Sequence, residues 1–168
     1  MIKLQNIQDY LCSESVISEI SNTGRWSWHG TRIQEYFNDE WLTDEYCNTR
    51  DRKRIIKQYL FEKSVSIHKD LISESPEKLY RAIYLEKGCV PDTTAYHGVF
   101  WSSNPNTSAC VQSDCNQVEW LLEVDFTMDL VDWNETLRSR IDYIHGDREQ
   151  EFQIKKGLVV NLVAKSII

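Results

Sequence analysis

The chain has 168 residues, of which 41% are hydrophobic and 27% are charged, a composition typical of one folded globular domain and not of a disordered chain. Its formal net charge of −7 repels phosphate backbones, so any contact with nucleic acid would need a local basic patch. No apolar run approaches the ~20 residues that span a bilayer. The five cysteines form no C-x-x-C pair, which favours reduced thiols in a cytoplasmic protein over a disulfide framework or a zinc site.

The first part of the sequence, residues 1–75, predicts helices. Apolar residues recur at near-helical spacing over residues 4–20 and predict one helix there. A second, shorter helix is expected over residues 31–41, and a third, longer one over residues 51–72. Pro76 follows the third helix and marks the end of the helical pattern.

After Pro76 the apolar pattern changes from helical to extended, and residues 134–148 are predicted to form a polar loop. Helices followed by strands predict an α+β fold with a mostly antiparallel sheet, in a single domain over residues 1–168 with a β-rich part at 76–168. The last two of the expected strands are joined by a turn at Lys156-Gly157. The strands are expected over residues 79–85, 98–102, 117–126, 151–154 and 158–163.

Two carboxylates, Glu149 and Glu151, lie at the entrance to the strand at residues 151–154. Because side chains alternate along a strand, both would point to one face and Gln150 to the other. Two acids on one face repel each other, so folding alone gains nothing from them, whereas chemistry that develops positive charge can use the pair. Glu-x-Glu also occurs by chance on solvated strands, so the pair needs support from other residues.

Two upstream segments supply further polar residues. Arg81 lies inside an otherwise apolar strand, where its charge needs an anionic partner, either an internal glutamate or a pyrophosphate. Ser102 and Ser103 end the strand at residues 98–102, where a hydroxyl group could fix a ribose or orient a carboxylate. Ser103 or Asn104, ahead of a proline, would also make a good helix N-cap.

In this order, the three segments resemble the R-S-E class of ADP-ribosyltransferases, whose patterns are an arginine on a first strand, an aromatic-x-Ser-Thr-Ser motif on a second and E-x-E on a later one. The resemblance covers roughly residues 79–163. Ser103 stands where the family has threonine, and Asn104 where it has its last serine. The matching segments are Tyr80-Arg81, Phe100-Trp101-Ser102-Ser103-Asn104 and Glu149-Gln150-Glu151.

The resemblance implies a split sheet of the ADP-ribosyltransferase type, and a reaction that releases nicotinamide from NAD and passes ADP-ribose to an acceptor. By the family's pattern Glu151 would stabilise an oxocarbenium-like transition state, and Glu149 would orient or deprotonate the acceptor, typically a protein arginine. Arg81 would hold the phosphates or ribose of NAD, and Ser102 would fix Glu151 and the nicotinamide ribose. No metal is expected. The other expected contacts to NAD are Tyr80, Phe100, Trp101 and Ser103.

In the family, the region before the acids recognises the acceptor. We therefore expect Arg138, Arg140 and Tyr143 to contact the target, with an exposed polar loop as the alternative. The expected partners are NAD, a target protein or nucleic acid and a neutralising antitoxin or immunity protein, without a membrane. Such an enzyme would be a bacterial toxin, an anti-phage effector or a phage enzyme that acts in the cytoplasm of the producing bacterium or of a host cell.

Three other interpretations remain open. The acceptor could be a base in RNA or DNA, because Arg50, Arg52, Lys53, Arg54 and Lys57 make a basic cluster on one predicted helix, although a solvated helix explains the cluster too. The acceptor could be water, which would make the protein an NAD hydrolase. The chain could also be a non-catalytic interaction domain that keeps the fold and no longer turns over NAD.

Overall fold

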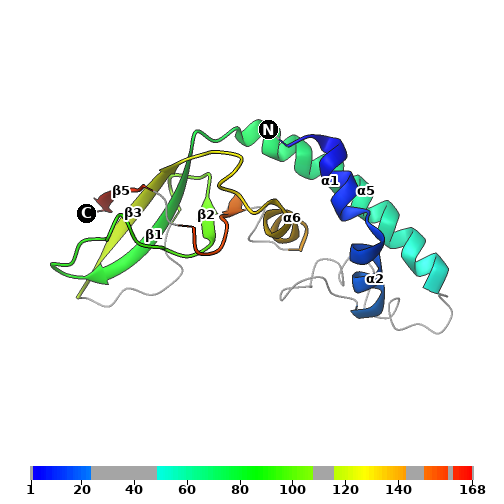
Figure 1. Ribbon diagram of the computed structural model, residues 1–168, viewed down its shortest axis with the longest axis horizontal. Helices are drawn as coiled ribbons and strands as arrows, with labels where there is room; N and C mark the ends of the chain where they lie inside the picture. The colour runs from blue at the N-terminus through cyan, green and yellow to red at the C-terminus, as the bar shows by residue number, and fades with distance from the viewer. Residues whose placement is uncertain (1, 24–48, 108–115, 143–149, 159–160, 168) are drawn as a thin grey trace. The chain divides into compact units, whose positions relative to one another are not determined.

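The structure, a computed structural model, falls into two compact units, which we call the helical unit and the sheet unit (Figure 1). The helical unit comprises Met1–Ser75 and Trp133–Arg148, and the sheet unit Pro76–Asp132 and Glu149–Ile168. The first boundary lies where the sequence predicts the change from helices to strands. The structure describes residues 2–23, 49–107, 116–142, 150–158 and 161–167.

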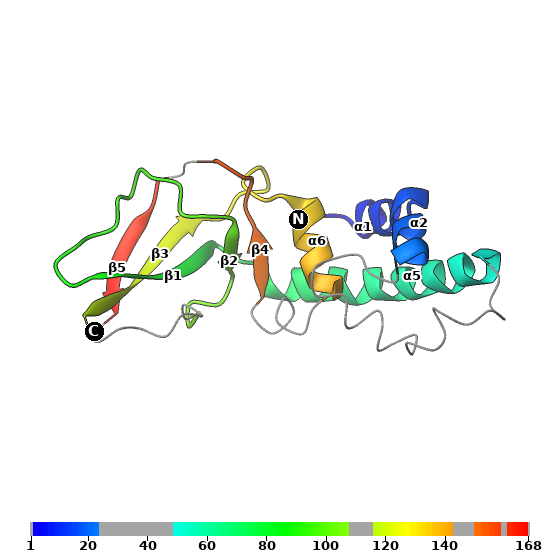
Figure 2. The ribbon, with the colours of Figure 1, turned by 90° about the horizontal axis from the view of Figure 1, so that it is seen from below.

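The helical unit contains α1, Leu4–Leu11, α2, Glu14–Thr23, α5, Thr49–Glu74, and α6, Trp133–Asp142. The long helix α5 confirms the prediction for residues 51–72, and the expected helix at 31–41 lies outside the described residues. α1 and α2 both pack on α5, as Figure 2 shows. Their fully buried apolar side chains form the core of this unit: Ile7, Leu11, Ile17, Ile20, Ile56 and Leu60.

The prediction of one continuous helix over residues 4–20 was wrong, because these residues form two helices, α1 and α2. α1 ends at Leu11, and the N–H of its C-cap residue, Cys12, donates to the carbonyl of Gln8. The carbonyl of Ser13 accepts the N–H of Ile17 at 3.0 Å and so begins α2. Serine is a favoured residue at the start of a helix, and this preference explains the interruption.

The polar loop predicted over residues 134–148 is also corrected, because Trp133–Asp142 forms helix α6. Leu137 and Ile141 lie one helical turn apart and are fully buried, so they supply the apolar side of this helix. Arg140 and Thr136 are buried as well. Polar residues on the inner side of the helix hid its periodicity from the sequence analysis.

The sheet unit contains one antiparallel sheet of five strands in the order β4-β2-β1-β3-β5. This arrangement confirms the α+β class and the antiparallel sheet. β1 and β3 are the long central strands, paired along their whole length. The strands are β1, Lys78–Glu86, β2, Phe100–Ser102, β3, Gln117–Asp125, β4, Glu151–Gln153, and β5, Val163–Ile167.

The last two strands, β4 and β5, do not pair with each other, and the strand predicted over residues 158–163 is corrected. β5 begins at Val163 and pairs with β3, on the opposite edge of the sheet from β4. The outer edge of β4 is already occupied, because Asp132 N–H donates to the Gln153 carbonyl at 2.8 Å and Val131 bridges Ile154. A strand directly after the turn at residues 156–157 would therefore meet Val131 and Asp132 at the end of β4.

One face of the sheet carries the apolar core of this unit. Leu79 and Val124 are register partners on β1 and β3, and Trp101 and Phe152 are partners on β2 and β4. All four are buried, and the ring of Phe126 meets that of Phe152 edge-on at 5.7 Å between centroids. None of the helices in the described part of the chain has both the length and the apolar composition needed to cross a membrane.

Candidate active site on the sheet unit

A row of polar side chains crosses four strands of the sheet. Ser102 on β2 is the register partner of Glu151 on β4. On the other side of β2, Ser102 is also the register partner of Tyr80 on β1. Tyr80 in turn lies opposite Glu123 on β3. Directly opposed residues in antiparallel strands present their side chains on the same face, so these four side chains form a continuous row. We call Glu151, Ser102, Tyr80 and Glu123 the polar row.

Ser102 is held in a turn that its own hydroxyl group helps to form. Its side chain is only 4% exposed, and its Oγ accepts the N–H of Asn104 at 3.0 Å. Asn104 Oδ1 accepts the N–H of Asn106 at 2.9 Å, so this asparagine supports the turn that follows, whereas the residues described directly after it contain no helix for it to cap. The chain after β2 is tied to the start of β4, because Ser103 N–H donates to the Gln150 carbonyl at 3.1 Å.

Glu151 is half-buried at the first position of β4. Its Oε1 accepts a hydrogen bond from Gln153 Nε2 at 3.1 Å. The two residues lie two positions apart on one strand, and so on the same face of the sheet. The carboxylate is therefore held by a neighbour on its own strand, on the face of the sheet that also carries Ser102.

The prediction that Glu149 and Glu151 point to the same face assumed that the alternation of a strand continues through Gln150, and the backbone of Gln150 does not continue it. Gln150 has a left-handed backbone with φ of 50°, and β4 begins only at Glu151. The alternation of side chains that holds within a strand does not apply across such a residue. Glu149 itself lies outside the described residues, and its role stays a prediction.

Arg81 is fixed by the loop that leads into β2. Its Nη1 donates to the carbonyl of Phe100 at 2.5 Å, and its guanidinium lies against Gly98. Gly98 has φ of +91°, and a Cβ there would lie 3.1 Å from Arg81 Nη2, so only glycine fits this position without a shift. Burial lowers the pKa of the Arg81 guanidinium, because its charge is partly removed from water. Its Nε is buried, and no group among the described residues hydrogen-bonds to it.

Arg81 does not lie in the polar row. Its register partner on β3 is the buried Leu122, whereas its neighbour Tyr80 faces Ser102. Alternation along β1 therefore directs Arg81 to the face of Leu79, away from that of Ser102 and Glu151. The structure makes the predicted serine and second glutamate register partners, and it places the guanidinium of the predicted arginine at the start of β2, by the carbonyl of Phe100.

The two aromatic residues predicted to contact NAD differ in accessibility. Phe100 is 54% exposed at the start of β2 and remains available to a ligand. Trp101 is 2% exposed, faces Phe152 across the strand pair, and donates from Nε1 to the Gly98 carbonyl at 3.1 Å. Trp101 is thus a core residue. Ser103 Oγ lies 3.4 Å from Gln150 Oε1 and so joins the two motifs at their ends.

The residues predicted to contact the acceptor belong to the helical unit. Arg140 is 2% exposed, and its two terminal nitrogens donate to the carboxylate of Glu74 at 2.5 and 2.8 Å. Arg138 lies 3.6 Å from both Glu19 and Glu135. Both guanidinium groups are therefore occupied by acids of their own unit, in place of the exposed loop expected from the sequence. Tyr143 lies outside the described residues.

The sequence analysis missed Glu123, a charged residue that is buried in the largely apolar strand β3. It is 6% exposed, and its carboxylate accepts hydrogen bonds from Lys165 and from Lys78, the latter at 3.1 Å. The hydrogen bond from Lys165, together with that from Lys78, lowers the pKa of the Glu123 carboxyl. The signal that could have found it is period-two alternation, because Glu119, Leu121 and Glu123 share a face of β3.

Comparison with known proteins does not assign the chain to a family, since no family model, no curated protein and no solved structure matches it. The described residues contain no group of three or more histidine, cysteine, aspartate or glutamate side chains that could hold a metal ion. The functional interpretation therefore rests on the geometry of the sheet unit.

Proposed function

We propose that the sheet unit transfers ADP-ribose from NAD to a protein arginine and releases nicotinamide, on a sheet of the ADP-ribosyltransferase type. One observation carries the proposal. Ser102 and Glu151, distant in sequence, are direct register partners on neighbouring strands, and their side chains share one face. A serine and a glutamate so placed are what the R-S-E pattern requires of its second and third motifs.

The pair suits a reaction in which positive charge develops on a sugar. Cleavage of the bond between ribose and nicotinamide has an oxocarbenium-like transition state, which a nearby carboxylate stabilises. The Glu151 carboxylate sits on a strand and is held by Gln153, so it needs little reorganisation when the charge appears. Ser102, whose Oγ accepts the N–H of Asn104, lies opposite Glu151 on the same face, so that its hydroxyl group can orient this carboxylate.

Arg81 has the properties of a phosphate-binding group. Its guanidinium is positioned by Gly98 and Phe100, and its partly desolvated charge gains from an anion. Because Arg81 lies on the opposite face of β1 from Ser102 and Glu151, the pyrophosphate of NAD would have to reach its guanidinium around the start of β2, where Nη1 lies by the Phe100 carbonyl. The exposed ring of Phe100, on the same segment, can pack on the nicotinamide or the adenine.

The acceptor is the least constrained part of the proposal. By the family's pattern Glu149 orients or deprotonates the acceptor, and a glutamate at this first position accompanies arginine acceptors. The acceptor must approach Glu151 from the side that the ribose leaves open. A nucleobase or water at the same place would turn the same chemistry into nucleic-acid modification or NAD hydrolysis.

The test uses NAD labelled in its ADP-ribose part, a bacterial lysate, the wild-type protein and Glu151→Gln. Glu86→Gln, on the exposed end of β1, is the matched control because it removes the same charge away from the polar row. We expect label on protein with the wild type and with Glu86→Gln, and a loss of about 100-fold or more with Glu151→Gln.

The distribution of the label decides between acceptors. Label removed by protease but not by nuclease supports protein as the acceptor, and removal by nuclease alone replaces it with a nucleobase. Release of nicotinamide without labelled product indicates hydrolysis. Absence of any NAD turnover contradicts the proposal and leaves a non-catalytic interaction domain.

A further inference from the structure

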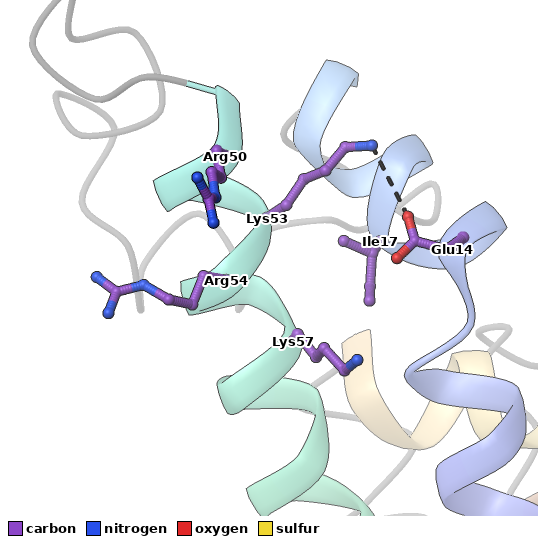
Figure 3. Close-up of a pocket in the computed structure, with 6 residues that line it drawn as sticks. All are labelled: Glu14, Ile17, Arg50, Lys53, Arg54 and Lys57. Atoms are coloured by element: carbon purple, nitrogen blue, oxygen red, sulfur yellow. Dashed lines mark ion pairs between the residues drawn. The ribbon is translucent and has the colours of Figure 1, made fainter.

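A basic pocket lies between α2 and the first turns of α5, within the helical unit (Figure 3). Its volume is about 550 Å³, in the range of pockets that hold small ligands. Four cationic side chains line it, with one acid and one apolar residue. The lining residues are Arg50, Lys53, Arg54, Lys57, Glu14 and Ile17.

The four cations form one stripe of α5. Arg50, Lys53, Arg54 and Lys57 follow the spacing that places side chains on one side of a helix, and all four line the pocket. In Figure 3 the Lys53 side chain extends toward Glu14, and that of Arg54 extends away from it. Arg52 is not part of this stripe, because its Nη1 lies 3.4 Å from the carbonyl of Ser21. The structure therefore selects four of the five basic residues that the sequence groups together.

Core packing does not explain the stripe. Lys53, Leu60 and Ile67 recur at heptad spacing and so lie on nearly the same side of α5. Leu60 and Ile67 are buried in the core, whereas Lys53 opens onto the pocket. The inner side of this helix is thus apolar along most of its length and cationic in its first turns.

The acids in the described part of the chain do not balance this charge. Lys53 Nζ lies 3.9 Å from Glu14 Oε2 and donates to Ser18 Oγ at 2.9 Å. Arg54 lies 3.7 Å from Asp51, on an exposed part of the helix. For Arg50 and Lys57 the described residues provide no ion pair. Like charges one turn apart destabilise a helix, and cations at its N-terminal end also oppose the helix dipole, so this arrangement lowers stability unless an anion binds.

We propose that this pocket binds phosphate groups carried in succession on one ligand, either a single nucleic-acid strand or a free pyrophosphate. From Arg50 to Lys57 the stripe extends about 10 Å along the helix axis, long enough for two or three neighbouring phosphates. The guanidinium groups offer paired donors to phosphate oxygens, and the lysines offer point charges. The inference is independent of ADP-ribose transfer, because the pocket belongs to the helical unit.

The test measures the binding of a fluorescent single-stranded 12-mer by anisotropy in the absence of NAD, with inorganic pyrophosphate as competitor. The pocket variant is Arg50→Gln/Lys57→Gln. The matched control is Lys63→Gln/Lys69→Gln, which removes the same charge from the same helix outside the pocket. We expect about tenfold weaker binding for the pocket variant, with a salt dependence smaller by about 1.4 in log–log slope, and less than a twofold change for the control.

A second variant is expected to increase the affinity of the pocket for the 12-mer. Glu14→Gln removes the one acid among the described residues that line the pocket and should tighten binding several-fold, an effect that misfolding cannot produce. If pyrophosphate displaces the 12-mer at an equal phosphate concentration, the ligand is a free phosphate compound; if it does not, the ligand is a strand. The proposal is overturned if the wild type binds neither probe, if both double variants weaken binding equally, or if Glu14→Gln leaves affinity unchanged.

Discussion

At the scale of single residues, the position of the Arg81 guanidinium depends on a glycine. Gly98 has φ of +91°, and its missing Cβ leaves room for the guanidinium at 3.1 Å. Gly88 has a similar φ of +95°, with no atom within 4 Å of the Cβ that alanine would add. A comparison of alanine substitutions at Gly98 and Gly88 therefore separates the cost of backbone strain from the effect on the position of Arg81.

We predict that Gly98→Ala weakens NAD binding about tenfold, because the added methyl group displaces the guanidinium from its place beside Phe100. Gly88→Ala should lower stability by a similar amount, about 1 kcal/mol, and leave NAD affinity unchanged. Calorimetric titration with NAD and thermal unfolding of both variants measure the two effects. Equal NAD affinity in the two variants would show that Gly98 does not position Arg81 for NAD.

Glu123 contributes stability that depends on pH. Its pKa is lowered in the folded protein, so its contribution is fully present above the pKa of an unfolded glutamate, about 4.3, and is lost as the pH falls through the folded value. We expect Glu123→Gln to lower the free energy of unfolding by about 1–2 kcal/mol at pH 7, a modest effect because both lysine partners are half-exposed.

The check is urea unfolding of the wild type and Glu123→Gln at pH 7 and at progressively lower pH. The difference in stability should narrow below about pH 4, since the carboxyl group of the wild type then takes up a proton. A difference that stays constant down to pH 3 would mean that Glu123 acts through packing and not through its charge.

At the scale of elements, an ion pair fixes helix α6 to the end of α5. Arg140 and Glu74 are almost completely buried, and two hydrogen bonds join them. Removing one member of such a pair leaves an unpaired charge in the interior, whereas removing both does not. We therefore expect Glu74→Gln to cost about 3–5 kcal/mol, and the double change Glu74→Leu/Arg140→Leu to cost less than the single change.

The control for this prediction is Arg138→Gln, because Arg138 is on the same helix but its ion pairs are longer and partly exposed. It should cost less than about 1 kcal/mol. Denaturant unfolding of the four proteins provides the comparison. A double change that costs more than the single one would mean that the pair contributes net stability beyond avoiding a buried charge.

How well the sequence predicted each element depended on where its polar residues lie. β1 and β3 were predicted almost to their ends because their apolar runs are long and they occupy the centre of the sheet. α6 was missed because Arg140, a charged residue, is on its buried side. The edge strand β5 was misplaced because edge pairing depends on which neighbouring edges are free, and Val131 and Asp132 take the edge of β4.

The candidate site was predicted in part for a similar reason. The structure makes Ser102 and Glu151 register partners on neighbouring strands, and the roles predicted for them stay predictions. The side of the sheet that Arg81 takes and the burial of Trp101 depend on local register and packing, which motif spacing does not fix. Left-handed Gln150 interrupts the alternation on which the pairing of Glu149 with Glu151 depended.

At the scale of the whole molecule, the charge of −7 is unevenly distributed, since four cations gather at one pocket of the helical unit while the sheet unit carries the polar row. A local basic patch on an acidic protein can bind phosphate at low salt and release it as salt rises. The two candidate sites belong to different units, so each can be tested by variants that leave the other unit unchanged.

The most direct test of the central claim is the rate of nicotinamide release from NAD by the wild type, Ser102→Ala, Glu151→Gln and the double variant. If the register partners act together on the ribose, Glu151→Gln lowers kcat about 100-fold or more, Ser102→Ala lowers it less, and the double variant is little slower than Glu151→Gln alone. Full turnover by Glu151→Gln would contradict the account, because the carboxylate opposite Ser102 would then have no part in the reaction.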